Sequence, residues 1–191
     1  MSFDPQPSHY VNGSFIVWHL VDIVAKGGQM QIGYGPDADG EFDPLAVEAL
    51  EYAGRWLETN GDAIYYSRPL VHADGVVSWN DTASSQVRYT RSKDNATIYA
   101  IALSGFGSAS TGAKLTLVDV VPTPGSEIYL LGYEHEANRT LIPIEWSPGQ
   151  VEAGGAASGA VLTVPTDVAA HPAVMGPGMA FVITGAPTGG W

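Results

Sequence analysis

The chain of 191 residues contains no cysteine. This absence excludes disulfide bonds, a thiolate nucleophile and any metal site built on cysteine ligands. Charged residues are also scarce, at 15% of the chain, so apolar packing and backbone hydrogen bonds must supply most of the stability. The length fits one ordinary domain, or one and a half small ones.

Basic side chains are few: 8 Lys and Arg stand against 20 Asp and Glu, which gives a formal net charge of −12. A surface with this charge repels phosphate backbones and anionic membranes, so we expect no nucleic-acid partner and no membrane partner. A neutral ligand such as a sugar is compatible with it.

The chain also lacks a long hydrophobic run. The longest one, residues 15–25, contains His19 and Asp22 and is too short to span a bilayer. The first ten residues do not show the basic region and apolar core of a signal peptide. These features predict a cytoplasmic protein, with an export signal on a longer parent chain left open.

The N-terminal part shows the periodicity of a helix, a short strand and a second helix. Ser14 is a good N-cap for a first helix that ends at Gly27–Gly28. Residues 29–34 form a short run bounded by glycine, which is typical of a strand. Asp43–Pro44 predicts the start of the second helix, and Asn60–Gly61 predicts its left-handed stop. The apolar face expected on the second helix consists of Ala46, Ala49, Leu50, Ala53, Trp56 and Leu57.

From about Ala63 onward the sequence changes to short alternating runs separated by Gly, Pro, Asn and Asp. Several short strands at this spacing favour an antiparallel β-sandwich. We therefore predict a mainly β protein with a short α/β N-terminal part, divided into residues 1–62 and residues 63–191. The clearest strand runs are residues 86–91, 97–103, 115–121, 128–131 and 161–164.

Four blocks of sequence stand out together: FIVWHLVDIVAKGG, GPDADG, AVEALEYAGRWLETNGDAIYYSRP and VRYTRSKDNATIYAIAL. In order and spacing they resemble the C-terminal third of family 29 glycoside hydrolases, the α-L-fucosidases. The resemblance implies the remnant of a (β/α)8 barrel followed by an antiparallel β-sandwich. Residues 14–26 would be the seventh barrel helix, residues 29–34 the last strand and residues 44–59 the last helix.

The same resemblance implies retaining hydrolysis of α-L-fucosides, in which an Asp nucleophile forms a fucosyl-enzyme and a second carboxylate is the acid/base. Both catalytic residues of the family would lie upstream of these blocks. No position of this chain matches the nucleophile motif, so neither catalytic residue is carried over.

Only the segment SFDPQPSHY corresponds to the family's sugar pocket, and it matches Phe3 to the ring that packs against fucose. Here Asp4–Pro5 stand where the family usually has Gly-Tyr. The predicted strand also departs from the family's nearly continuous apolar run, because Gln29, Gln31 and Gly33 alternate with apolar residues. This alternation favours a strand with one solvent-facing side.

The loop GPDADG carries carboxylates between the predicted strand and the second helix. Asp37, Asp39 and the following Glu41 are candidate acid/base residues, because such loops form the active-site face of a (β/α)8 barrel. The alternative is structural: Asp37 and Asp39 form Asx turns with Gly40. We favour the structural alternative, since the family's catalytic carboxylates lie elsewhere.

Trp79 and Trp146 lie at the ends of predicted strands and are candidates for substrate binding, because flat indole rings stack on the C–H faces of sugars. His135 lies between two glutamates, but neighbouring residues of a strand point to opposite faces. We therefore expect an exposed hairpin there and not a metal site. No metal and no cofactor is indicated.

These observations leave three functional hypotheses. The first is a truncated α-L-fucosidase-type hydrolase that acts on a fucosylated glycan or small fucoside and depends on another chain or assembly for catalysis. The second is a non-catalytic β-sandwich module that binds carbohydrate or mediates association. The third is an enzyme with a new site at its own oligomer interface, using Asp37, Asp39 or Glu41. An apolar patch around Trp18 and Leu20 predicts a homo-oligomer or a complementing barrel chain.

Overall fold

The computed structural model describes residues 4, 6–72, 74–81, 86–104, 113–118, 120–131, 141–149, 159–165 and 178–185. Two α-helices come first in the chain, α1 (Gly13–Ala25) and α2 (Pro44–Asn60), with short 3-10 turns at Pro7–His9 and Gly61–Ala63. The strands are β1 (Ser67–Pro69), β2 (Trp79–Asp81), β3 (Gln86–Ser92), β4 (Thr97–Ser104), β5 (Ala113–Leu117), β6 (Glu127–Leu130), β7 (Ile142–Pro143), β8 (Glu145–Pro148), β9 (Ala160–Val164) and β10 (Met179–Thr184).

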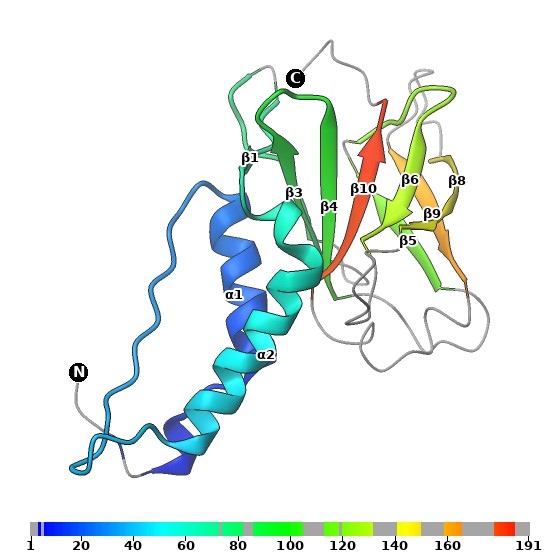
Figure 1. Ribbon diagram of the computed structural model, residues 1–191. Helices are drawn as coiled ribbons and strands as arrows, with labels where there is room; N and C mark the ends of the chain where they lie inside the picture. Colours follow the sequence, from blue (N-terminus) through cyan, green and yellow to red (C-terminus); the bar gives the residue numbers. More distant parts are fainter. Residues whose placement is uncertain are drawn as a thin grey trace.

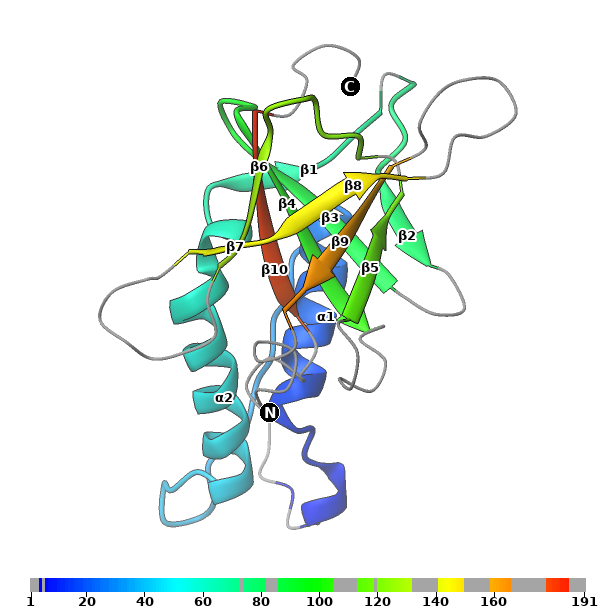
Figure 2. The ribbon, with the colours of Figure 1, turned by 90° about the vertical axis from the view of Figure 1, so that its right-hand side faces the viewer.

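The strands form two antiparallel sheets that face each other (Figures 1 and 2). The larger sheet has the order β1-β3-β4-β10-β6-β7, with β2 paired to β3, and the smaller one has the order β5-β9-β8. Helices α1 and α2 lie against the outer face of the larger sheet (Figure 1). The molecule is therefore mainly β, with a helical layer at its N-terminal end, as the sequence predicted.

Strand β4 explains how the three layers are held together, because both of its faces are buried. Ile98, Ala100 and Ala102 face the smaller sheet, whereas Ile101 and Leu103 face the helices. One apolar cluster therefore fills the sandwich and a second joins the sheet to α1 and α2. A strand between two apolar layers has to be a nearly continuous apolar run, which the sequence TIYAIAL supplies.

Helix α1 begins two residues earlier than the sequence predicted. The side chain of Asn12, and not that of Ser14, is the N-cap, and its Oδ1 accepts a hydrogen bond of 2.8 Å from the Phe15 amide. The predicted end is confirmed: Gly27 has a φ of +84°, which glycine adopts without strain. The Gly28 amide donates to the Ile23 carbonyl and the Gly27 amide to the Val24 carbonyl, so the last turn closes as a Schellman motif.

Helix α2 begins at Asp43–Pro44 as predicted, because Asp43 Oδ1 accepts a hydrogen bond from the Leu45 amide. Its predicted left-handed stop is wrong: Gly61 has φ −60° and ψ −24°, and the chain continues into the 3-10 turn. The helix packs on α1 through small residues, since a Cβ atom at Gly13 would overlap Tyr52. Leu50, which we expected on the buried face, is 44% exposed. The alanines at positions 46, 49 and 53, which were expected on the same face, are buried.

The strand predicted at residues 29–34 is not part of either sheet. These residues run extended beside α1 and return the chain to the N-terminal end of α2 (Figure 1). Their side chains alternate as predicted, with Met30, Ile32 and Tyr34 half-buried and Gln29, Gln31 and Gly33 exposed. A β-strand also needs a hydrogen-bonded neighbour, and no strand of the described part of the chain lies beside this segment. The alternation of exposed and half-buried residues was therefore predicted correctly, but the segment has no paired strand in the described part of the chain.

Candidate functional site

The loop between the extended segment and α2 is held together by one carboxylate. Asp37 Oδ1 accepts hydrogen bonds of 2.9 Å from the Asp39 amide and 2.9 Å from the Glu41 amide. The backbone closes the same turn, because the Asp37 amide donates to the Glu41 carbonyl and Gly40 adopts a φ of +88°. An oxygen that already accepts two amide hydrogen bonds is positioned to fix the turn.

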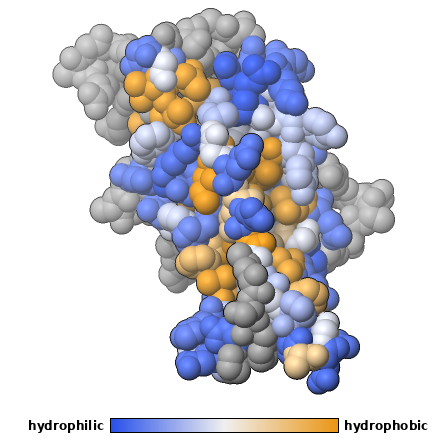
Figure 3. All heavy atoms as spheres, turned by 90° about the vertical axis from the view of Figure 1, so that its left-hand side faces the viewer, coloured by the Kyte–Doolittle hydropathy of each residue, from blue (hydrophilic) through white to orange (hydrophobic). Residues whose placement is uncertain are grey.

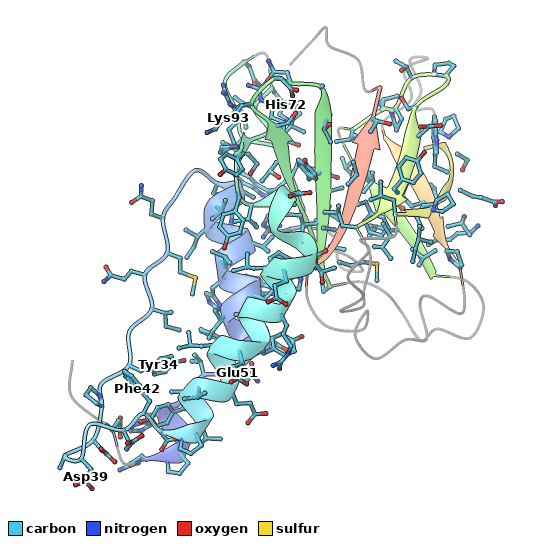
Figure 4. The ribbon with its side chains drawn as sticks, in the orientation of Figure 1. Tyr34, Asp39, Phe42, Glu51, His72 and Lys93 are labelled. Carbon is cyan, nitrogen blue, oxygen red and sulfur yellow. The ribbon has the colours of Figure 1, made fainter. Side chains whose placement is uncertain are left out.

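The other acids of this loop stand apart from the body of the protein. Asp39 and Glu41 are exposed, and Figure 4 shows Asp39 at the outer tip of the loop. The nearby Asp43 is used as the cap of α2. The loop therefore presents two carboxylates to solvent and uses two within the fold.

Two of the grooves in the described part of the chain lie along the helical layer. The first has a volume of about 330 Å³ and lies between the start of α1 and α2, where Glu48 is its single acid and Arg55 its single basic group. The second has a volume of about 490 Å³ and lies between α1 and residues 29–34. Its lining contains His9 and His19 but no carboxylate. Neither groove thus brings two carboxylates together.

An Asp–His pair stands beside the second groove. His9 Nδ1 lies 2.7 Å from Asp4 Oδ2, and the hydrogen bond with His9 lowers the pKa of Asp4. Tyr10 donates a hydrogen bond to the Asp4 carbonyl and stacks on Tyr34 with the ring centroids 5.8 Å apart. Burial raises the pKa of Tyr34, whose hydroxyl is buried and has no hydrogen-bond partner among the described residues. These contacts hold the N-terminal residues against the extended segment.

A cluster of charges at the junction of helix and sheet was not anticipated from the sequence. Arg88, on β3, is 2% exposed and donates to Asp22 Oδ1 on α1 and to Asp81 Oδ1 on β2, both at 2.6 Å. Lys26 joins the cluster through Asp22 at 2.7 Å. The chain separation of 66 residues between Asp22 and Arg88 left no local signal for this contact. The cluster ties the helical layer to the sheet.

The protonation of this cluster is set by competition between burial and pairing. Burial alone would raise the pKa of Asp22, but hydrogen bonds from Lys26 and Arg88 outweigh it and the pKa lies below the usual value. Burial alone would likewise lower the pKa of Arg88, and its two carboxylate partners raise it instead. Asp22 and Arg88 are thus both held in their charged forms.

The two tryptophans proposed for sugar binding occupy different environments. Trp79 on β2 is 42% exposed, and the Lys26 ammonium lies 5.4 Å from its ring centroid, so the ring stands at the edge of the charged cluster. Trp146 on β8 is half-buried against the sandwich core, and its indole N–H donates to the Ser126 carbonyl at 3.2 Å. Phe3 and His135 lie outside the described residues.

Two absences concern only the part of the chain that the structure describes. No group of three or more His, Asp or Glu side chains within it is placed to hold a metal ion. Neither is any of its helices long and apolar enough to cross a membrane.

Comparison with known proteins shows which family this chain is similar to. The sequence profile of the family described as Alpha-L-fucosidase matches residues 2–62. The α-L-fucosidase of Branchiostoma floridae is 32% identical over 137 residues, which cover 72% of this chain and 26% of that protein. The human tissue α-L-fucosidase is 36% identical over 130 residues, which cover 68% of this chain and 25% of that protein. This chain matches the C-terminal part of the family 29 α-L-fucosidases.

Solved α-L-fucosidases share the fold. The Thermotoga maritima α-fucosidase in complex with a mechanism-based inhibitor superposes with a TM-score of 0.66 at 22% identity, over 94% of this chain and 35% of that one. The α-L-fucosidase isoenzyme 1 from Paenibacillus thiaminolyticus gives 0.64 at 21% identity, over 97% and 37%. The chain thus spans about a quarter of the length of the curated fucosidases and about a third of the solved ones.

Proposed function

We propose that this chain serves an α-L-fucosidase-type glycoside hydrolase, and that hydrolysis depends on carboxylates contributed by another chain or assembly. The similarity to α-L-fucosidases carries the first part of the proposal. The relatives' names specify α-L-fucosidase, so the substrate class is a fucosylated glycan or a small α-L-fucoside.

The second part follows from the chemistry of retention. A retaining glycosidase needs two carboxyl groups about 5–5.5 Å apart across the scissile bond. Of the two grooves, one is lined by Glu48 as its only acid and the other by none. Asp37 is engaged in its own turn and Asp39 is at the loop tip. These positions support a structural role for the loop. They also favour a catalytic carboxylate pair that comes from outside the chain.

The proposal is tested by incubating the purified chain with an aryl α-L-fucoside and following phenolate release. We expect no turnover by the wild type. Turnover that persists in Asp37→Asn, Asp39→Asn and Glu41→Gln would refute the need for outside carboxylates and point to another acid of this chain. Turnover abolished by one of these changes would instead favour a new site at the loop, which is the third hypothesis above.

A non-catalytic carbohydrate-binding role is a second candidate, and the exposure of Trp79 is the observation that favours it. A ring at the surface beside Lys26 and Asp81 combines a stacking face with hydrogen-bonding groups, as sugar recognition requires. Isothermal titration with L-fucose tests this role. Binding should be lost in Trp79→Ala and retained in Val76→Ala, which shortens a side chain that is 53% exposed and has no ring. Equal affinities for fucose in both variants would refute it.

A further inference from the structure

Three of the eight basic residues of the chain gather where β1 pairs with β3. The antiparallel register places Arg68 of β1 directly opposite Arg91 of β3. Lys93 follows β3, and its ammonium lies 5.5 Å from the ring centroid of Tyr66, which precedes β1. We call these four residues the basic edge. Figure 4 shows Lys93 at the end of the molecule remote from Asp39.

No carboxylate of the described residues balances the basic edge, because none of its three cations forms an ion pair there. Asp94 is used in its own turn, where Oδ1 accepts hydrogen bonds from the Ser92 hydroxyl and the Ala96 amide. On the side away from β1, the cross-strand neighbour of Arg91 is Ile98. Arg91 Nε is buried and has no hydrogen-bond partner among the described residues. Like charges directly opposite each other destabilise a sheet, so fold stability does not explain this pair of arginines.

Tyr66 adds an aromatic ring in an unusual conformation. Its φ of +61° lies in the left-handed region, which a bulky side chain rarely adopts. The side chain is 83% exposed, and that of the neighbouring Tyr65 is 55% exposed. The strained backbone of Tyr66 therefore brings the fold little burial in return. Such conformations cluster at ligand-binding sites, and an exposed phenol ring offers a flat face to a sugar.

The two arginines point away from the helical layer. Val87 and Tyr89 of β3 are part of the core between the two sheets, and side chains alternate along a strand. Arg91 and the opposite Arg68 therefore share that face, whereas the helices lie against the other one. Figure 3 shows apolar residues gathered along the middle of the helical side of the molecule, between polar margins. The basic edge is separate from that apolar surface and suits a polar ligand.

We propose that the basic edge binds an acidic sugar, a pyranose that carries a carboxylate or a sulfate ester. Guanidinium groups form paired, charge-assisted hydrogen bonds with oxyanions, and the ring of Tyr66 stacks on the sugar. A compact ligand touches only the basic edge, because charges farther away than about 8 Å are screened at physiological salt. A nucleic acid would extend over the acidic surface. The site goes beyond the proposed function, since no glycosidic bond is broken at it.

Three methyl glucosides that differ only at C6 test the proposal by isothermal titration of the purified chain. They are methyl β-D-glucuronide, methyl β-D-glucoside 6-sulfate and the neutral methyl β-D-glucoside. At least one acidic sugar should bind at least about ten-fold more tightly than the neutral one, and the tighter of the two identifies the acid group. Its affinity should fall as salt is added.

Variants assign the binding to the basic edge. Arg68→Gln with Arg91→Gln should weaken the acidic sugar by at least about ten-fold. Arg55→Gln, which removes an exposed arginine of α2, is the control and should leave the affinity unchanged. Without ligand, Arg68→Gln should keep or raise the Tm, because it removes a like-charge pair. Tyr66→Gly fits the positive φ and should weaken binding of the sugar but not of inorganic sulfate.

The proposal is overturned if neither acidic sugar binds, or if the neutral glucoside binds as tightly. Equal affinities in the double arginine variant and the wild type would place the contact elsewhere. Inorganic sulfate that binds as tightly as the 6-sulfate, with no effect of Tyr66→Gly on either, would show an adventitious ion only. Hydrolysis of an aryl fucoside is measured separately, so failure here leaves the proposed function untouched.

Discussion

Arg88 is the residue whose role the sequence concealed most completely. In the run QVRYTR it reads as a polar residue on the outer face of an alternating strand. The structure buries it between Asp22 of α1 and Asp81 of β2. A buried guanidinium requires carboxylate partners, but spacing along the chain cannot show which carboxylates these are. The strand was predictable and the ion pairs were not.

Removing Arg88 should therefore cost far more than removing an arginine from a surface pair. Arg88→Ala leaves Asp22 without its closest cation, and we expect the free energy of unfolding to fall by about 3 kcal/mol. Arg55→Ala breaks an exposed pair with Glu51 at 3.6 Å and should cost less than about 0.5 kcal/mol. Urea unfolding measures both. Similar losses for the two variants would contradict the role assigned to Arg88.

The contribution of Asp22 to stability should depend on pH. Its folded pKa lies below the usual value, so the unfolded chain binds this proton more tightly. The stabilisation is therefore present above about pH 4 and is lost as the pH falls further. Asp22→Asn should lower the free energy of unfolding by about 2 kcal/mol at pH 7, with a smaller difference at pH 3. A difference that stays constant between these pH values would show that the charge of Asp22 is not involved.

At the scale of elements, the sequence predicted features set by neighbouring residues better than those set by long-range strand pairing. The helix stop at Gly27 and the start at Asp43–Pro44 are confirmed, because both depend on residues next to them in the chain. Strand β10 was missed, although MAFVIT lies between Gly178 and Gly185 and pairs with both β4 and β6. A six-residue apolar run between glycines is a usable signal for a buried strand. Its central place in the sheet is a long-range property.

The structure and the sequence prediction disagree about the N-cap of α1, and two substitutions can decide between Asn12 and Ser14. Asn12→Ala removes the hydrogen bond to the Phe15 amide and should cost about 1 kcal/mol of stability. Ser14→Ala changes the residue that the sequence suggested and should cost less than about 0.5 kcal/mol. Thermal unfolding of the two variants checks this. A larger loss at Ser14 would restore the sequence prediction.

At the scale of the whole molecule, the helical layer and the sandwich share apolar packing. The cluster that contains Val17 and Val21 of α1 also contains Ile101 of β4 and Ala180 of β10. We propose that residues 1–62 and residues 63–191 are distinct parts that unfold together, as shared burial requires. Calorimetry and near-ultraviolet circular dichroism should therefore give a single coincident transition. Two separated transitions would show that the parts fold independently.

The resemblance to the family could be recognised from four sequence blocks. Whether residues 29–34 are paired in a sheet could not be predicted from them. Residue patterns placed α1 and α2 and found the alternation in residues 29–34. Whether that segment has a hydrogen-bonded neighbour depends on long-range contacts, which local patterns do not report. The charged cluster beside Trp79 depends in the same way on contacts between distant residues.

This chain matches the C-terminal part of the α-L-fucosidases, and we propose that it does not supply the catalytic nucleophile. A retaining enzyme forms a covalent bond between its carboxylate and the sugar, and a 2-fluoro-fucosyl fluoride traps that intermediate. The direct measurement is the intact mass of the purified chain after incubation with this reagent. We predict an unchanged mass, and a stoichiometric 2-fluoro-fucosyl adduct on an Asp or Glu of this chain would contradict this proposal.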